Sequence, residues 1–300
     1  MNEILKVNTP DDFLSYVGAQ SRHPLVGVID FEKVSPIPSS VNSYKVYGLF
    51  MHNNIPNDLT YGCGTYDYRS GTLICVAPGQ IGGREESGAL IELDGWALLF
   101  HPDLIKGTHL EKEIRDFTFF DYQVNEALHM SEGEKSILAT LMRQIQTEIE
   151  NGEDASQKNI LIGYITAMLN YCQRFYNRQF QTRKVENSDI LMRFNAILTE
   201  YFESDIQLDR GLPGVQYFAD KMNMSPNYFS DVIKRYTGEN PSNIIREYVM
   251  RLAKNALKSS GNIAQVAYSL GFEYPQHFTR MFKKQTGITP KQYLKNSRLG

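Results

Sequence analysis

The stretch YPQHFTRMFKKQTGITP, residues 274–290, occurs in a second version as SPNYFSDVIKRYTGENP, residues 225–241. The two copies share six residues at a constant offset of 49 positions: Pro226 and Pro275, Phe229 and Phe278, Lys234 and Lys283, Thr237 and Thr286, Gly238 and Gly287, and Pro241 and Pro290. A stretch that recurs in this way indicates one structural unit that the chain uses twice. The fold of this end of the chain therefore follows from what a single copy forms.

Each copy predicts a helix, a tight turn and a second helix. In the first copy, over about residues 214–238, Ser225 is a good N-cap, and Pro226 suits the first helical position, where its missing N–H costs nothing. Gly238 can adopt a positive φ and should end the second helix. The second copy, over about residues 263–287, follows the same order.

The segment between the copies predicts a long helix. It reads NIIREYVMRLAKNALKSS, residues 243–260, and its apolar residues recur about every four positions from Ile244 to Leu257. That spacing gives a helix with a broad apolar face, which can hold the two units at a fixed separation. In the second copy, Gly271-Phe272 is the expected turn, and Gly287 is the expected end of the second helix.

A helix-turn-helix places its second helix in the major groove of DNA, with the residues of the first turns on the base edges. Asn and Gln can make paired hydrogen bonds to adenine, and Arg can do so to guanine. The candidate base-reading residues are Asn227, Tyr228, Ser230, Asp231, Pro275, Gln276, His277, Thr279 and Arg280, and the candidate phosphate-binding residues are Lys234, Arg235, Lys283 and Lys284. The alternative is a pair of amphipathic helical hairpins with charged surfaces. It explains the apolar stripes but not the shared glycine, proline and basic pair.

The net charge of −3 conceals a division along the chain. Residues 211–300 hold 13 Lys and Arg against 5 Asp and Glu, whereas residues 1–210 hold 18 against 29. A basic module joined to an acidic one indicates a polyanionic partner for the basic module. On charge alone, a solvated basic face without any partner is an equal alternative.

Residues from about 187 to 300 resemble the DNA-binding region of the AraC/XylS family of bacterial transcription regulators. The resemblance rests on IAQVAYSLGFEYPQHFTRMFKKQTGITPKQYL, residues 263–294, and on FADKMNMSPNYFSDVIKRYTG, residues 218–238. It implies two recognition helices in successive major grooves on one DNA face, about 34 Å apart. Asp231 stands where the family commonly has a basic or amide residue, and Pro275 has no side-chain donor. Direct readout should therefore depend mainly on the second unit.

The same resemblance implies a sequence-specific transcription regulator. Its implied partners are double-stranded DNA, a second copy of the chain, a small-molecule effector and RNA polymerase. Two alternatives stay open: an effector-free regulator controlled by a protein partner, and a cupin-like enzyme fused to a DNA-binding module.

The first half of the chain predicts a different class of fold. Short apolar runs between Gly, Asn, Asp and Pro indicate an antiparallel β barrel or sandwich, and the family resemblance implies a cupin-like regulatory barrel. The fold class of the whole chain is then α+β. It comprises a β domain over residues 1–125, a helical dimerisation segment over 126–182, a linker at 183–189, and an all-α DNA-binding domain over 190–300.

Aromatic side chains of the predicted β domain could line an effector pocket, and packing in the core is the alternative for each of them. The candidates are Phe31, Tyr44, Tyr47, Phe50, Tyr61, Tyr66 and Trp96. Metal-dependent cupins need a His-x-His with a nearby Glu and a further His, whereas the histidines here stand singly. No metal ligand, cofactor or catalytic residue is therefore predicted.

Two helices are predicted after the β domain. The first opens at Ser131, with Glu134 three residues later, which is the pattern of a capping box. The second lies within residues 158–180 and is apolar around more than half of its circumference. Its candidate dimerisation stripe consists of Ile162, Leu169 and Tyr176. A helix buried wholly within its own domain is the alternative.

The three cysteines, Cys63, Cys75 and Cys172, form no CxxC motif, so neither a disulfide framework nor a zinc finger is supported. The first residues lack the basic start and apolar run of a signal peptide. The most apolar stretch, NILIGYITAML, is too short to span a bilayer. The sequence predicts a cytoplasmic protein with no membrane partner.

Overall fold

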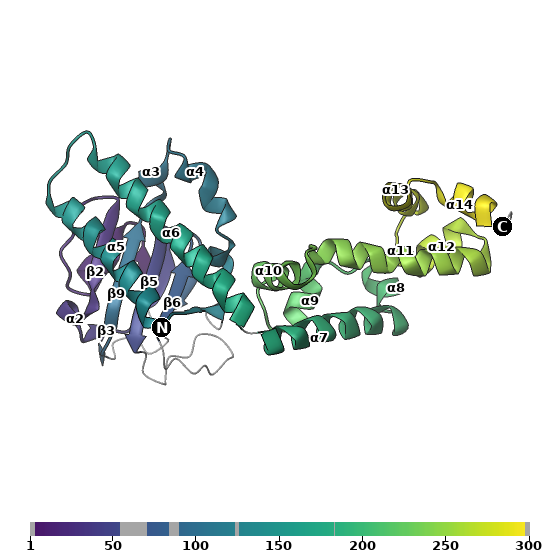
Figure 1. Cartoon of the computed structure of the whole chain (residues 1–300), viewed down its shortest axis with the longest axis horizontal. Helices are drawn as coiled ribbons and strands as arrows, with labels where there is room; N and C mark the ends of the chain where they lie inside the picture. Colours follow the sequence, from purple (N-terminus) through teal and green to yellow (C-terminus); the bar gives the residue numbers. More distant parts are fainter. Residues whose placement is uncertain (1–3, 55–70, 84–89, 124–125, 183, 298–300) are drawn as a thin grey trace. The chain divides into compact units, whose positions relative to one another are not determined.

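The computed structural model describes residues 4–54, 71–83, 90–123, 126–182 and 184–297. The chain divides into two compact units, a first unit at Met1–Thr182 and a second unit at Arg183–Gly300. The first unit contains the strands and the second is helical (Figure 1), so the chain is α+β, as predicted.

The strands of the first unit are short. They are β1 (Leu5–Val7), β2 (Val26–Asp30), β3 (Ile37–Pro38), β4 (Val41–Tyr44), β5 (Tyr47–Asn54), β6 (Thr72–Val76), β7 (Ile81–Gly83), β8 (Leu90–Ile91), β9 (Asp94–Phe100) and β10 (Leu128–His129). The main sheet is antiparallel, with its five strands in the order β10-β6-β5-β9-β2. Its central strand β5 places Gly48 opposite Val76 on one side and Leu99 on the other.

Two smaller sheets accompany the main one, with the strand orders β1-β4-β7 and β3-β8. β1 pairs with β4 in parallel, which corrects the prediction of a purely antiparallel domain. The two strands are separated in the chain by two helices and two other strands, and such a long crossover allows parallel pairing where a tight hairpin would not.

The first unit also contains short helices that the sequence pattern did not indicate. Its helices are α1 (Pro10–Tyr16), α2 (Phe31–Val34), α3 (Pro102–Ile105), α4 (Leu110–Glu113), the 3-10 helices η1 (Ile114–Asp116) and η2 (Thr118–Asp121), α5 (Glu132–Glu150) and α6 (Gln157–Thr182). The capping box that opens α5 is confirmed. The N–H of Glu134 donates to Oγ of Ser131 at 3.3 Å, and the N–H of Ser131 donates to Oε2 of Glu134 at 2.8 Å.

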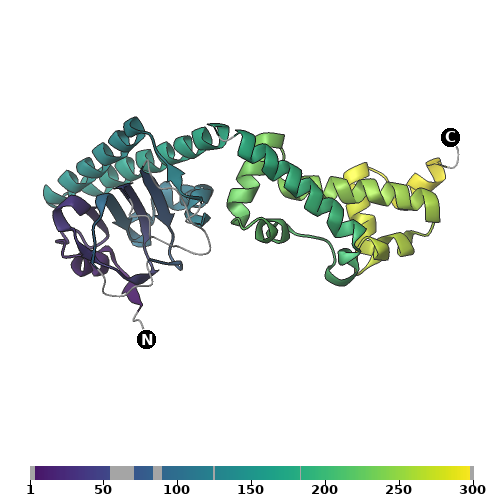
Figure 2. The ribbon, with the colours of Figure 1, turned by 90° about the horizontal axis from the view of Figure 1, so that it is seen from below.

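The two faces of the main sheet are covered differently. Phe50 and Ala97 lie on one face and pack in a core cluster with Phe13 and Leu14 of α1 and with Phe31 of α2. Helices α5 and α6 lie together over the opposite face, in contact with β9 and β10 respectively (Figures 1 and 2). Because successive residues of a strand point to opposite faces, this arrangement buries both sides of β5.

The second unit consists of eight described helices. They are α7 (Lys184–Glu203), α8 (Ile206–Arg210), α9 (Val215–Lys221), α10 (Pro226–Thr237), α11 (Pro241–Ser260), α12 (Ile263–Ser269), α13 (Pro275–Thr286) and α14 (Pro290–Ser297). The bounds of α9 to α13 follow the predicted helices closely. α7 already begins at Lys184, inside the segment 183–189 predicted as a linker, which contains no Gly or Pro to interrupt a helix.

Candidate nucleic-acid interface

The two helix-turn-helix units form the same turn with different residues. Asn223 in the first helix-turn-helix unit has a φ of 54°, and Gly271 in the second helix-turn-helix unit has a φ of 85°. In each unit the next residue donates its N–H to the carbonyl of the alanine five positions earlier, Ala219 at 2.9 Å and Ala267 at 3.0 Å. Gly and Asn adopt a positive φ more readily than other residues, which explains why both sequences turn at this position.

The ends of the second helices agree with the prediction. α10 begins after Ser225, whose Oγ accepts a hydrogen bond from the N–H of Tyr228 at 3.2 Å, and Pro226 follows at the first helical position. Both α10 and α13 end at a glycine in the left-handed region, Gly238 with φ 77° and Gly287 with φ 79°. These local signals fix the length of both helices.

One side of α13 is buried and the other carries predicted DNA-binding residues. Phe278 and Phe282, one helical turn apart, are fully buried, and this fixes the rotation of the helix about its axis. The predicted DNA-binding residues that are exposed are Gln276, His277, Arg280, Lys283 and Lys284. Thr279 and Pro275 are half-buried, and the Thr279 hydroxyl donates to the carbonyl of Pro275 at 3.0 Å. That hydroxyl is therefore already engaged with the backbone.

α10 presents its predicted base-reading residues less openly than α13 does. Asn227, Ser230 and Asp231 are half-buried, whereas Lys234 and Arg235 near the end of the helix are exposed. The basic pair is thus accessible in both helix-turn-helix units, but the fully exposed polar positions of the first turns belong to α13.

Tyr228 corrects the prediction for α10. Its side chain is only 6% exposed, so it cannot reach a base edge as α10 is placed. Tyr228 lies one turn before the buried Val232 and beside the buried Phe229, and residues four apart share one face of a helix. The ring therefore belongs to the buried side of α10.

The turn of the second helix-turn-helix unit is packed closely against α8. Gln207 of α8 is buried, and its side-chain Nε2 donates to the carbonyl of Ser269 at 3.1 Å. A Cβ atom added at Gly271 would lie 2.6 Å from the carbonyl oxygen of Gln207. At the end of α8, the Tyr201 hydroxyl of α7 donates to the carbonyl of Gly211 at 2.9 Å. α8 thereby connects α7 with the turn that positions α13.

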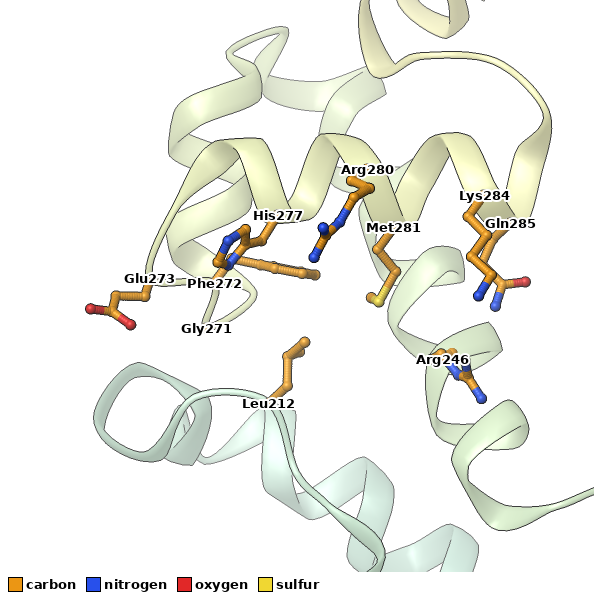
Figure 3. Close-up of a pocket in the computed structure, with 10 residues that line it drawn as sticks. All are labelled: Leu212, Arg246, Gly271, Phe272, Glu273, His277, Arg280, Met281, Lys284 and Gln285. Carbon is orange, nitrogen blue, oxygen red and sulfur yellow. The ribbon is translucent and has the colours of Figure 1, made fainter.

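A groove with a volume of about 560 Å³ runs beside α13 (Figure 3). It is lined by Arg280 and Lys284 of α13, by Arg246 of α11 and by Leu212 of the connection between α8 and α9. Figure 3 shows Arg280 and Met281 extending from α13 into the groove, toward Leu212 on its opposite wall. Arg246 is not among the predicted site residues. Its only signal in the sequence is a positive charge within the apolar pattern of α11.

Three aromatic residues predicted for an effector pocket lie in the core of the first unit. Phe31, Tyr44 and Phe50 are all less than 9% exposed and belong to the same core cluster. This placement favours the core alternative for these three side chains.

The remaining pocket candidates are placed differently. The ring of Tyr47 stacks on that of Phe100 at 5.1 Å, and Trp96 is half-buried. Tyr61 and Tyr66 lie outside the described residues. Neither placement decides between the pocket and the core for these four candidates.

Two polar side chains of the main sheet, which the sequence pattern did not single out, are buried without a hydrogen-bond partner in the described structure. They are His52 of β5, through Nδ1, and Thr72 of β6, through Oγ1, and the two residues lie directly opposite each other in the sheet. The His52 ring stacks on Phe31 at 5.6 Å. Burial lowers the pKa of His52 to about 4, against the opposing effect of the Asp94 charge, so the imidazole is neutral at pH 7.

The predicted dimerisation stripe is wrong, because its three residues are buried inside the first unit. Ile162, Leu169 and Tyr176 are 2%, 0% and 1% exposed. The Tyr176 ring stacks on Phe119 at 5.5 Å and meets Tyr122 edge-on at 5.2 Å. α6 is therefore buried within its own domain along this stripe, as the alternative proposed.

Other reactive groups give no further candidate site within the described part of the chain. No group of three or more His, Cys, Asp or Glu side chains there is placed to hold a metal ion. Burial raises the pKa of the free thiols Cys75 and Cys172, so both are protonated at neutral pH and are poor nucleophiles. No described helix is long and apolar enough to cross a membrane.

Comparison with known proteins supports the assignment of the second unit. Residues 218–296 match the model of a family described as a helix-turn-helix domain. The HTH-type transcriptional regulator YtdP of Bacillus subtilis is 31% identical over 103 residues, which are 34% of this chain and 12% of that protein. The regulator AlkR of Acinetobacter baylyi is 32% identical over 84 residues, 28% of each chain.

A longer match covers part of the first unit as well. The HTH-type transcriptional regulator YidL of Escherichia coli is 21% identical over 221 residues, which are 71% of each chain. The second unit is shorter than this alignment, so the alignment also includes residues of the first unit. The first three relatives are matched over only 12%, 6% and 33% of their own lengths. The chain thus carries an AraC-type helix-turn-helix domain in its second unit, and through it the chain is related to HTH-type transcriptional regulators.

Proposed function

We propose that the chain is a sequence-specific DNA-binding transcription regulator of the AraC type. The observation that carries the proposal is the exposed face of α13, where Gln276, His277 and Arg280 precede the basic pair Lys283 and Lys284. Amide and guanidinium groups at the start of a recognition helix suit the edges of adenine and guanine, and the cations behind them suit phosphates. The matching turn in the first helix-turn-helix unit supports a second docking site one helical turn of DNA away.

The proposal is one of binding and not of catalysis, and it includes a homodimer and contact with RNA polymerase. These partners are proposed from the family resemblance. The face that joins two copies must differ from the buried stripe of α6.

Selection of genomic DNA fragments by the purified full chain tests the proposed function. We expect enrichment of a motif with two parts whose centres lie about 10 base pairs apart, because the two recognition helices enter successive major grooves. Equal recovery of all fragments, or recovery of none, would contradict the proposal.

Arg280→Ala should cost about 1–3 kcal/mol in affinity for the selected site and relax base preference at one position. The reason is that Arg280 is exposed on the reading face of α13, where a guanidinium can bond a guanine edge in two places. The measurement is the same selection repeated with the variant. Lys283→Ala is the matched control, and it should weaken specific and random DNA alike. An unchanged base preference for Arg280→Ala would show that α13 does not dock as assigned.

The effector of the proposed regulator is small and uncharged, and it binds beside His52 and Thr72 of the main sheet. A buried polar group without a partner carries a desolvation cost that a ligand hydrogen bond would remove. Nδ1 of the neutral imidazole donates or accepts according to the tautomer, and a hydroxyl does both, so hydroxyl, carbonyl or amide groups are suitable.

A thermal-shift screen of uncharged metabolites on the full chain tests this effector proposal. A compound at 100 times its dissociation constant should add about 2.7 kcal/mol to the free energy of unfolding. It should also change affinity for the selected DNA, because an effector acts through unequal affinity for two states. Thr72→Val is the diagnostic variant: the free protein should keep its stability, because the lost hydroxyl has no partner, while the gain from the compound should fall. If no compound stabilises the chain, the effector-free alternative takes its place.

A further inference from the structure

The groove beside α13 continues toward the first helix-turn-helix unit. A second hollow of about 190 Å³ adjoins it, and the two share Leu212, Arg246 and Met281 in their linings. The second hollow extends to Val215, at the start of α9. The combined groove therefore lies on the path from the second helix-turn-helix unit to the first.

The rim of the main groove is positively charged. Arg246, Arg280 and Lys284 contribute three cations, and Glu273 is the one carboxylate among the described residues that line it. Its apolar lining includes Leu212 and is a surface that sugar carbons could cover. This combination suits a polyanion with apolar segments between its charges.

Arg246 is held in position before any ligand arrives. It is half-buried, its Nε donates to the carbonyl of Ser242 at 2.8 Å, and its Nη2 donates to Oδ1 of Asn243 at 2.7 Å. A guanidinium has five N–H groups, so these two bonds leave three for a ligand among the contacts that the structure describes. A cation oriented in this way loses little side-chain entropy when it binds a phosphate.

The groove is continuous with the proposed base-reading face. Arg280 and Lys284 belong to the exposed side of α13 and also line the groove, and Figure 3 shows Arg246 on the neighbouring helix below them. If two recognition helices occupy successive major grooves, the DNA backbone between those grooves must cross the protein between α10 and α13. α11 joins these two helices in the chain.

We propose that this groove seats the DNA backbone between the two major grooves, and that Arg246 binds one of its phosphates. The inference rests on the proposed DNA-binding function and adds a contact that reads no bases. One strand of duplex DNA carries one charge for about every 3.4 Å of the helix axis, so a backbone that crosses the groove brings a phosphate within reach of the rim. Arg246 would then contribute affinity and register but no base preference.

The test is the salt dependence of DNA binding by the full chain. If about six phosphates are neutralised, the log–log slope should be near −5 for the wild-type protein. Arg246→Gln should reduce the slope by about one and lower affinity about fivefold at 0.15 M salt, equally for the selected site and for random DNA. Arg251→Gln is the matched control. Arg251 lies on the same helix but on another side of it, exposed and over the Tyr248 ring at 4.7 Å, and its loss should leave the slope unchanged.

A second variant tests the same groove in case Arg246→Gln disturbs the fold. Gln285→Glu is nearly isosteric at an exposed residue of the groove, and its carboxylate should repel the backbone and weaken specific and random DNA severalfold. Unchanged slopes and affinities for both Arg246→Gln and Gln285→Glu would overturn the inference, while normal binding by the wild type would leave the proposed function intact. Failure of the wild type to bind any DNA would instead reject the proposed function itself.

Discussion

Leu169→Glu should unfold the first unit instead of separating two copies of the chain. Leu169 is fully buried on α6, on the stripe that it shares with Ile162 and Tyr176. The change removes a packed side chain and places a carboxylate in an apolar interior, which costs more than lost packing alone. We expect a loss of at least about 4 kcal/mol in the free energy of unfolding, measured by urea denaturation of the full chain.

Ile160→Glu is the matched control for this prediction. It makes the same chemical change on the same helix, but Ile160 is 39% exposed, so its cost should be about 1 kcal/mol or less. Sedimentation of both variants gives their mass in solution. If Leu169→Glu kept the wild-type stability and only fell to the mass of a monomer, the stripe would face a second copy and its burial within one chain would be wrong.

The sequence predicted α6 but could not predict what covers it. Its apolar residues extend around more than half of the helix, and a seven-residue spacing from Ile162 to Tyr176 is typical of a subunit contact. In the structure, Phe119 and Tyr122 pack on Tyr176 instead. They come from a segment about 50 residues earlier, and periodicity within one helix carries no information about such distant neighbours.

The helix-turn-helix units were predictable because their signals are local. A cap such as Ser225 and a terminal glycine such as Gly238 act on residues within one turn, so the sequence alone specifies where α10 begins and ends. The error at Tyr228 has a physical reason too. The buried side of α10 is wide enough to include a large ring beside Phe229, and a tyrosine pattern does not distinguish a buried ring from an exposed one.

The pairing of strands could not be predicted from the sequence, for the same reason as the residues that pack on α6: the partners are distant in the chain. Alternating apolar residues predict that β5 and β6 are strands, but the register that sets His52 opposite Thr72 depends on the whole sheet. Neither residue belongs to a motif, and only their common burial without partners distinguishes them. The parallel pairing of β1 with β4 likewise depends on the path of the long segment between them, and the sequence of neither strand predicts it.

Gly271→Ala should destabilise the second unit by at least about 3 kcal/mol and weaken DNA binding. Gly271 has a φ of 85°, a conformation that costs an L-residue about 1–2 kcal/mol. The added Cβ would also stand 2.6 Å from the carbonyl oxygen of Gln207, so α8 or the turn must move. Because the turn sets the position of α13, a shift there should displace Arg280 and its neighbours from the DNA. Urea denaturation and binding to the selected site measure the two effects.

Gly238→Ala separates the backbone strain from the close contact. Gly238 has nearly the same φ, 77°, but no heavy atom of the described residues, apart from its own chain neighbours, lies within 4 Å of the position that its Cβ would take. Its substitution should therefore cost only the conformational term of about 1–2 kcal/mol. The difference between the two variants is the cost of moving α8, which the Tyr201 hydroxyl and the Gln207 amide hold against α7 and the turn. An equal loss in the free energy of unfolding for both variants would mean that α8 moves without cost and does not position the second recognition helix.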